Sequence, residues 1–331
     1  MTATNLSAGK HPKDAPFERN PGASFDTSFL ENIQVNRSAV NDVQPLSRAA
    51  YREEKEWQAA WLLKAITCID LTTLAGDDTR GNVMRLCAKA LDPVRHDLLA
   101  ALGMEEAGIT TGAVCVYHNL IPFAKEVIGN KGLPIAAVST GFPAGKITLE
   151  DKIEEIEKSV AAGATEIDIV ISRDLVLNAK WEELYHEVAL CRKACGDAHL
   201  KTILATGEIP TYTQVAKASM VSMMAGSDFI KTSTGKESVN ATLPVSLVML
   251  RMIRAYHEMT GYKVGFKPAG GIQKAKQSLD WLILIKEELG NEWLTPHLFR
   301  FGASSLLGDI ERQLEHFVTG SYSAAFRHPM G

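Results

Sequence analysis

The sequence predicts an α/β protein folded as a (β/α)8 barrel with an N-terminal helical extension, because strand-like and helix-like segments alternate along most of the chain. Eight short apolar runs have the length of buried strands, and helical patterns separate them. Landmark residues in the last five runs are 36, 27, 36 and 34 residues apart, which is the spacing of βα units (Asp168, Leu204, Lys231, Lys267 and Phe301).

The eight runs are the candidate strands of the barrel. In chain order they read AITCID, GAVCVY, IAAVST, EIDIVI, LKTILAT, DFIKTS, KVGFKPA and LFRFGAS. A doubly wound open sheet is the competing architecture, but it more often carries a G-x-G-x-x-G turn after its first strand, where this chain reads IDLTTLAGDD. The barrel is therefore favoured, and reactive groups are expected at the C-terminal ends of its strands.

Composition along the chain predicts four segments. Residues 1–26 are polar and rich in Gly, Pro and Ser, which predicts a flexible arm. We expect a helical extension over 27–60, with a helix over 47–66 that leads into the first strand. The barrel is predicted over 61–318 and a C-terminal tail over 319–331.

The clearest helix signal is the segment TLEDKIEEIEKSVAAGA. Ile153, Ile156 and Val160 mark one face of it. Thr148 followed three residues later by an acidic residue is typical of a helix start, and Gly163 of a helix end.

Composition also limits the partners of this protein. The chain has 331 residues, 46% of them hydrophobic, and a formal net charge of −4. This balance provides no general basic field for nucleic acid or an anionic membrane surface. No apolar run reaches the roughly 20 residues that cross a bilayer, and the polar opening does not predict a secretory signal.

The cysteine pattern indicates reduced thiols in the cytoplasm. Five cysteines are an odd number, which does not favour a disulfide framework (Cys68, Cys87, Cys115, Cys191 and Cys195). Two of them, Cys191 and Cys195, have i, i+4 spacing on a predicted helix and could form half of a metal site. Since no matching second pair is present, we expect packed thiols and neither a metal nor another cofactor.

Three predicted strands carry a charged residue in an apolar setting: Asp168, Lys231 and Lys267. An unpaired buried charge costs several kcal/mol, so these groups are expected to find one another or a ligand. A purely structural ion-pair network is the alternative, but two lysines and one aspartate leave one positive charge in excess. A lysine beside another cation in a poorly solvated site has a lowered pKa, and its neutral amine attacks carbonyl groups. Lys231 or Lys267 is thus a candidate nucleophile, and Asp168 a candidate for proton transfer.

Other candidate residues lie at the ends of the strands. Glycine-rich turns read TSTGKES, KPAGGIQ and RFGASSLLGD, and the last two lie where barrels commonly bind phosphate, after strands seven and eight. Asp70, with Thr72 close by, could face the same mouth, although spacing alone slightly favours a cap or turn role for Asp70. Cys115 is expected to be a thiol that lines the barrel.

Taken together, the motifs IDLTTL, EIDIV, DFIKTSTGK, VGFKPAGG and RFGASSLL resemble the deoxyribose-phosphate aldolases in order and spacing, over roughly residues 60 to 310. The resemblance implies a class I aldolase that cleaves 2-deoxy-D-ribose 5-phosphate to D-glyceraldehyde 3-phosphate and acetaldehyde without a metal. The N-terminal length and the segment EWLTPHLFRFG resemble the longer, eukaryote-like branch.

The resemblance also implies roles for individual residues. Lys231 corresponds to the Schiff-base lysine, Lys267 to the lysine that lowers its pKa, and Asp168 to the proton-transfer residue. Asp70 and Thr72 correspond to the polar pair at the substrate hydroxyls. The remaining expected substrate contacts are Cys115, Thr234, Gly235, Lys236, Gly270, Gly271, Gly302, Ser304 and Ser305.

Two positions depart from the family pattern. Gln273 stands where bacterial members carry an arginine that contacts phosphate. The tail ends in SYSAAFRHPMG, which leaves open whether Tyr322 reaches the site as a terminal tyrosine does in some members.

Two other functions remain open from the sequence. One is a different Schiff-base aldolase or a transaldolase that acts on ketoses. The other is a catalytically silent barrel that serves as a binding module, although a scaffold without use for buried charges should lose them. The sequence also leaves open whether the chain forms a homo-oligomer.

Overall fold

The computed structural model describes residues 19–43 and 55–328, and it confirms the parallel barrel. Its strands are β1 (Ile69–Thr72), β2 (Ala113–Tyr117), β3 (Ile135–Ser139), β4 (Glu166–Val170), β5 (His199–Ile203), β6 (Phe229–Lys231), β7 (Gly265–Lys267) and β8 (Phe301–Ala303). Each strand pairs in parallel with its sequence neighbour from β1 to β7, and β8 pairs with β1.

The barrel is closed between β7 and β8 by isolated bridges instead of a continuous ladder. Phe266 pairs with Phe299, and Ala269 pairs with Gly302. The amide of Arg300 donates to the carbonyl of Phe266 at 3.1 Å, which extends this closure toward the start of β8. The interior therefore has no open sheet edge along the described strands.

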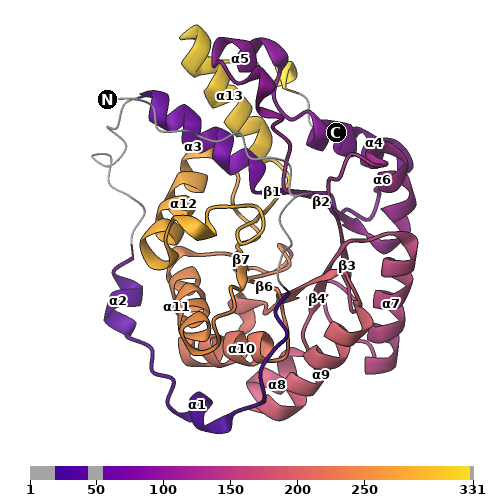
Figure 1. Ribbon diagram of the computed structural model, residues 1–331, viewed down its shortest axis with the longest axis vertical. Coiled ribbons are helices and arrows are strands. Elements are labelled where there is room, and N and C mark those ends of the chain that lie inside the picture. The colour runs from indigo at the N-terminus through magenta and orange to yellow at the C-terminus, as the bar shows by residue number, and fades with distance from the viewer. Residues whose placement is uncertain (1–18, 44–54, 329–331) are drawn as a thin grey trace.

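Helices form an outer ring around the strands (Figure 1). They are α1 (Thr27–Glu31), α2 (Arg37–Asn41), α3 (Lys55–Thr67), α4 (Arg80–Leu91), α5 (His96–Ala101), α6 (Ile121–Ile128), α7 (Leu149–Ala162), α8 (Arg173–Leu177), α9 (Trp181–Ala194), α10 (Tyr212–Met224), α11 (Leu243–Thr260), α12 (Ala275–Leu289) and α13 (Leu306–Thr319). Short 3-10 turns are η3 (Glu105–Ala107), η4 (His118–Leu120), η5 (Thr206–Glu208), η6 (Asn291–Trp293) and η7 (Ala325–Arg327). Because helices cover the outside and side chains fill the inside, the strands read as apolar runs.

The clearest predicted helix, α7, begins and ends as expected. The hydroxyl of Thr148 accepts a hydrogen bond from the amide of Asp151 at 3.2 Å, and Gly163 ends the helix in the left-handed conformation with φ 111°. Of the predicted apolar face, Ile156 is buried, whereas Ile153 and Val160 are half-buried.

The first predicted strand was placed too early. Ala65, Ile66 and Thr67 of the run AITCID form the end of α3, and β1 begins at Ile69. Ala65 and Ile66 are fully buried on the helix, and a short buried run looks the same in a helix as in a strand.

Part of the predicted flexible arm is anchored to the barrel. Residues 1–18 lie outside the described part of the chain, but Asn20 is only 3% exposed. Its side-chain amide donates to the carbonyls of Met223 and Ser227, both at 2.8 Å, and its oxygen accepts from the Tyr256 hydroxyl at 2.9 Å. Its backbone amide also donates to Asp228 at 3.1 Å. The Asn20 side chain therefore forms hydrogen bonds with buried groups about 200 positions away in the chain. Composition alone does not reveal such distant contacts.

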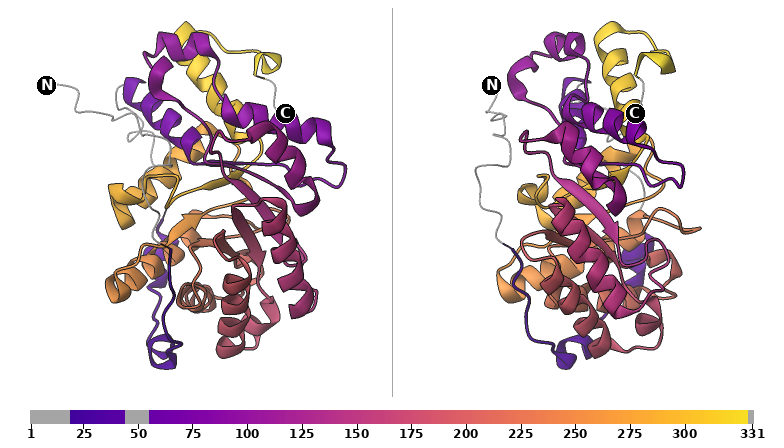
Figure 2. Two further views of the ribbon diagram at one scale, coloured as in Figure 1. Left: turned by 45° about the vertical axis from the view of Figure 1, so that its right-hand side comes forward. Right: turned by 90° about the vertical axis from the view of Figure 1, so that its right-hand side faces the viewer.

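Beyond this anchor the chain runs along the outside of the ring (Figure 2). α1 and α2 follow, and α2 packs against α11. The helix predicted over 47–66 is described only from residue 55, because residues 44–54 lie outside the described part. At the other end, residues 320–328 follow α13 and bring His328 into a buried contact with Glu315 at 2.5 Å.

Within the described residues, each helix is too short or too polar to cross a bilayer. All five cysteines are free and buried. Cys191 lies on the inner face of α9 and Cys195 follows its last residue, so both are packed thiols as expected. Over residues 19–43 and 55–328, side chains form no cluster suited to a metal ion.

We predict that Asn20→Ala lowers the free energy of unfolding by about 2–4 kcal/mol, because it leaves the buried Tyr256 hydroxyl and two carbonyls without their partner. Urea unfolding measures the change. Asn32→Ala is the matched control, since the Asn32 side chain makes its hydrogen bond to Ser28 at an exposed position. An equal free energy of unfolding for the Asn20 variant and the parent would show that the segment around Asn20 does not stabilise the barrel.

Candidate active site

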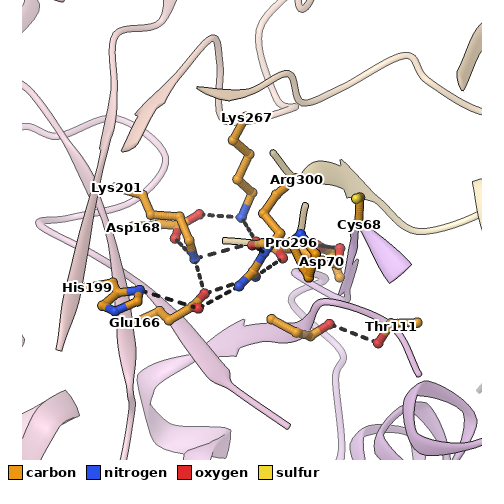
Figure 3. A network of polar contacts seen from close by, with 12 residues as sticks. Cys68, Asp70, Thr111, Glu166, Asp168, His199, Lys201, Lys267, Pro296 and Arg300 are labelled. Carbon is orange, nitrogen blue, oxygen red and sulfur yellow. Dashed lines mark hydrogen bonds and ion pairs between the residues drawn. The ribbon is translucent and has the colours of Figure 1, made fainter. Parts of the chain in front are cut away.

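A network of seven charged side chains fills the interior of the barrel, and none of them is more than 3% exposed. Figure 3 shows Lys201, Lys267 and Arg300 converging on the carboxylates of Asp168, Asp70 and Glu166. The members come from β1 (Asp70), β4 (Glu166 and Asp168), β5 (Lys201), β6 (Lys231), β7 (Lys267) and the residue before β8 (Arg300).

Asp168 lies between three amines. Its Oδ2 accepts from the Nζ atoms of Lys231 and Lys267, both at 2.8 Å, and its Oδ1 accepts from Lys201 at 3.0 Å. Strand register explains this arrangement, because Lys231 pairs with Lys267 across β6 and β7, and Asp168 pairs with Lys201 across β4 and β5. Residues in register on parallel strands point to the same side, here into the barrel.

A second group of ion pairs links Lys201, Lys267 and Arg300 to Asp70 and Glu166. The Arg300 guanidinium donates to Asp70 at 2.5 Å and to Glu166 at 2.8 Å. Lys201 contacts Glu166 at 2.5 Å and Asp70 at 3.5 Å, and Lys267 donates to Asp70. Gly112 leaves room for Arg300, since a Cβ at this position would lie 3.0 Å from the Arg300 Cδ.

The network contains more positive than negative charge. Four cationic groups (Lys201, Lys231, Lys267 and Arg300) face three carboxylates (Asp70, Glu166 and Asp168). The excess of one positive charge that the sequence predicted is thus present, but in a larger set of groups. His199 contacts Glu166 at 3.9 Å, and burial lowers its pKa to about 4, so the imidazole is neutral at pH 7 and leaves this balance unchanged.

The lysines differ in how many carboxylates they contact. Among the described residues, Lys231 contacts one, Asp168, whereas Lys267 contacts two and Lys201 three. Burial and the adjacent Lys267 ammonium outweigh Asp168, so the pKa of Lys231 is lowered from its ordinary value. Burial acts in the same direction on Lys267, but there Asp168 and Asp70 outweigh it, and its pKa is raised.

The carboxylates remain ionised because of these cations. Burial would raise the pKa of Asp168, but Lys201, Lys231 and Lys267 hold that pKa well below its ordinary value. Arg300 and Lys201 likewise overcome the effect of burial on Glu166 and lower its pKa to about 2. Of the groups in the network, Lys231 therefore stands out as the amine that loses its proton most readily.

Sequence reasoning brought together Asp168, Lys231 and Lys267. It named Asp70 as a further candidate and missed Glu166, Lys201 and Arg300. The sequence analysis considered charged residues in three predicted strands. In the structure, β1, β5 and the residue before β8 also contribute charged side chains. Glu166 lies two positions before Asp168 on the same face of β4, a spacing that could have revealed it. Lys201 and Arg300 stand in the predicted runs LKTILAT and LFRFGAS, where a charge within apolar residues was the same signal.

Three further predicted site residues, Asp70, Thr72 and Cys115, lie on β1 and β2. Asp70 is fully buried within the network, so it is more than a cap or turn residue. Thr72 is half-buried and donates to the carbonyl of Asp70 at 2.7 Å. Cys115 is fully buried in β2 in a small apolar cluster with Leu74 and Val138, and burial raises the pKa of its thiol.

The predicted phosphate turns lie next to one another at the C-terminal ends of β6, β7 and β8. A Cβ on Gly235 would lie 3.8 Å from the Cα of Gly270, and one on Gly302 would lie 3.3 Å from the Lys267 Cε. Gly270 and Gly271 both have φ 81°, which favours glycine.

The ends of these turns are accessible. Gly271, Lys236, Ser304 and Ser305 are exposed, whereas Thr234 is buried. Ser305 precedes α13, and its side chain makes no capping hydrogen bond. The N-terminus of α13 is therefore open to an anion at the strand ends.

The two positions that departed from the family pattern lie apart from the network. The amide of Gln273 donates to the side chain of Gln277 at 2.9 Å, next to the start of α12. The ring of Tyr322 stacks on His316 with centroids 4.5 Å apart and is 86% exposed. In this arrangement Tyr322 packs against α13 and is open to solvent, unlike the buried lysines.

Comparison with known proteins identifies a family. Residues 64–304 match the family described as DeoC/LacD family aldolase. The deoxyribose-phosphate aldolase of Mus musculus is 61% identical over 311 residues, which are 93% of this chain and 98% of the mouse protein. The deoxyribose-phosphate aldolase of Homo sapiens is 59% identical over 313 residues, 94% of this chain and 98% of the human protein.

Solved structures at lower identity share the fold. A Toxoplasma gondii protein is 22% identical, with a TM-score of 0.67 over 80% of this chain and 96% of its own. The tetrameric deoxyribose phosphate aldolase from Aeropyrum pernix is 21% identical, with a TM-score of 0.54 over 82% of this chain and 99% of its own.

We predict that Lys267→Met raises the pKa of Lys231. Removal of the adjacent ammonium takes away a charge that lowers this pKa, while Asp168, which raises it, stays in place. Each unit by which the pKa rises reduces the neutral amine about tenfold at any pH below it. Reductive methylation with ¹³C-formaldehyde followed by an NMR titration measures the pKa. An unchanged titration of Lys231 would contradict the role of Lys267.

Proposed function

Since this chain belongs to the DeoC/LacD family of aldolases, we propose that it cleaves 2-deoxy-D-ribose 5-phosphate reversibly to D-glyceraldehyde 3-phosphate and acetaldehyde, through a Schiff base on Lys231. The observation that carries the proposal is the contrast between two adjacent buried lysines. Lys231 contacts one carboxylate and has a lowered pKa, whereas Lys267 contacts two and has a raised pKa. The first has the properties of a nucleophile and the second those of a fixed positive charge.

The first stage of the reaction forms the imine. The neutral amine of Lys231 attacks the C1 aldehyde of the open-chain sugar, and loss of water from the carbinolamine gives a protonated Schiff base. The Asp168 carboxylate is 2.8 Å from the Lys231 Nζ and accepts a hydrogen bond from it in the resting state. It is thus placed to move protons at this nitrogen and at the departing hydroxyl.

The second stage breaks the bond between C2 and C3. Removal of the proton from the C3 hydroxyl releases D-glyceraldehyde 3-phosphate, and the electron pair of the broken bond passes into the iminium as an enamine. Protonation at C2 and hydrolysis then release acetaldehyde and restore Lys231. The iminium nitrogen takes up the electron pair, so the proposed reaction requires no metal and no other cofactor.

The other charges keep the central carboxylate in place during these steps. Lys231 becomes neutral before it attacks, and Asp168 then keeps Lys267 and Lys201 as partners at 2.8 and 3.0 Å. A buried carboxylate without cations would take up a proton. Lys267 and Lys201 keep Asp168 ionised in the resting state, ready to accept a proton during the reaction, and Arg300 holds Asp70 and Glu166.

The glycine-rich turns are proposed to hold the phosphate. Gly270 and Gly271 follow β7, while Gly302, Ser304 and Ser305 follow β8, the usual place of a phosphate site in barrels. The open N-terminus of α13 and the close approach of Gly302 to Lys267 support this assignment. Thr234, Gly235 and Lys236 form the third part of the proposed site.

The cellular setting is also part of the proposal. Five free, buried cysteines support a reducing compartment such as the cytoplasm. The Aeropyrum pernix aldolase is tetrameric, and a homo-oligomer is proposed here by analogy. The segment boundaries at residues 26, 60 and 318 are retained as a proposed division into arm, helical extension, barrel and tail.

We predict that borohydride reduction in the presence of acetaldehyde leaves a stable adduct on Lys231, because it is the most readily deprotonated amine of the network. Peptide mapping by mass spectrometry locates it. Lys231→Met should give no adduct and no activity at any pH, whereas a modified Lys267 would reverse the two roles. Competition with short ketones separates this reaction from that of a ketose aldolase or transaldolase, and no adduct at all would support a silent binding module.

We predict that Ser305→Asp raises KM for deoxyribose 5-phosphate at least about tenfold more than KM for unphosphorylated deoxyribose, because a carboxylate at the start of α13 repels the phosphate dianion. Steady-state kinetics with both sugars measure the two changes. Ser38→Asp, at an exposed position of α2, is the matched control and should affect neither. An equal loss for both sugars would place Ser305 away from the phosphate.

A further inference from the structure

The turn after β6 already holds an anionic group. Both carboxylate oxygens of Glu237 accept from the amide of Thr234, at 3.1 and 3.0 Å, and one of them also accepts from the Thr234 hydroxyl at 2.7 Å. The same oxygen accepts from the amide of Gly235 at 3.2 Å. A side chain of the protein thus occupies three donors of one of the proposed phosphate turns.

The shape of this turn is that of an anion-binding loop. Gly235 has φ 87°, which turns successive amides toward one side of the chain, where the Glu237 carboxylate lies. The turn adjoins the second proposed phosphate turn, since a Cβ on Gly235 would be 3.8 Å from the Cα of Gly270. An anion held by both turns would therefore lie next to Glu237.

A phosphate and this carboxylate compete for the same place. Each N–H of the turn provides one strong hydrogen bond, and the three donors are engaged by Glu237. A phosphate dianion beside an unmoved carboxylate would also be repelled by its charge. A phosphate that bound while the Glu237 carboxylate stayed in place would lack these three hydrogen-bond donors and would be repelled by the carboxylate.

We infer that Glu237 is an internal competitor of the substrate phosphate: its carboxylate caps the turn when no phosphate is bound and leaves the amides of Thr234 and Gly235 when phosphate arrives. This inference rests on the proposed function, because it assumes a phosphorylated substrate at these turns.

The surroundings of Glu237 allow this movement. The residue is half-buried in the loop between β6 and α11, and its neighbours Lys236 and Ser238 are exposed. The side chain is therefore partly open to solvent, on the surface of the loop. The Asn240 side chain donates to the backbone carbonyl of Glu237 at 2.9 Å, which holds the main chain while the carboxylate moves.

The test uses Glu237→Gln, which keeps the shape and removes the charge, and Glu237→Ala, which removes the competing group. Titration calorimetry with inorganic phosphate measures anion binding without turnover. We expect the dissociation constant to fall about tenfold in both variants, since a charge-assisted competitor is lost. The ratio of KM for deoxyribose to KM for deoxyribose 5-phosphate should rise by a similar factor.

Glu157→Gln is the matched control, because it removes one exposed negative charge from α7 and should leave phosphate binding unchanged. Unchanged or weaker phosphate binding in Glu237→Gln would overturn the inference. If Glu237 only shapes the turn, Glu237→Ala binds phosphate more weakly and Glu237→Gln matches the parent. Failure of the proposed function has a different signature, namely no acetaldehyde adduct on Lys231 in the parent protein.

Discussion

The excess of buried positive charge is the constraint on which the chemistry of this barrel depends. Three carboxylates cannot neutralise four cations, so one amine must be less compensated than the others. The contacts assign this position to Lys231, which shares Asp168 with Lys267, while Lys267 and Lys201 bind further carboxylates. The lowered pKa of Lys231 thus follows from burial and from the whole network, in which Lys267 is the adjacent cation.

The closed parallel barrel stabilises this network in a buried site, because it brings opposite charges from distant strands into contact. Adjacent strands in register direct Lys231 and Lys267 to the same side, and closure between β7 and β8 brings Arg300 to the acids of β1 and β4. An open sheet would separate Asp70 on β1 from Lys267 on β7. Closure therefore provides the carboxylate contact that keeps Lys267 charged beside Lys231, whose pKa is lowered.

The sequence predicted those features that repeat or that stand out locally. Even spacing of apolar runs revealed the barrel, and charges in apolar runs revealed Lys231, Lys267 and Asp168. Lys201 and Arg300 carried the same local signal, but their importance depends on which strands meet across the interior, and this is a property of the closed fold. Asn20 was hidden in a similar way, because its partners are more than 200 residues away in the chain and its own segment is polar.

The two ends of the proposed site work by opposite electrostatic principles. The reacting end holds charges that are at most 3% exposed, so its amine is tuned before any substrate enters. The phosphate end is exposed and contains a carboxylate, Glu237, on the donors that the substrate needs. In the proposed cleavage the phosphate stays on the three-carbon product, so strong, uncontested donors would retain product as firmly as substrate. A competing carboxylate weakens the hold on the phosphate of the product as well as on that of the substrate, which speeds product release.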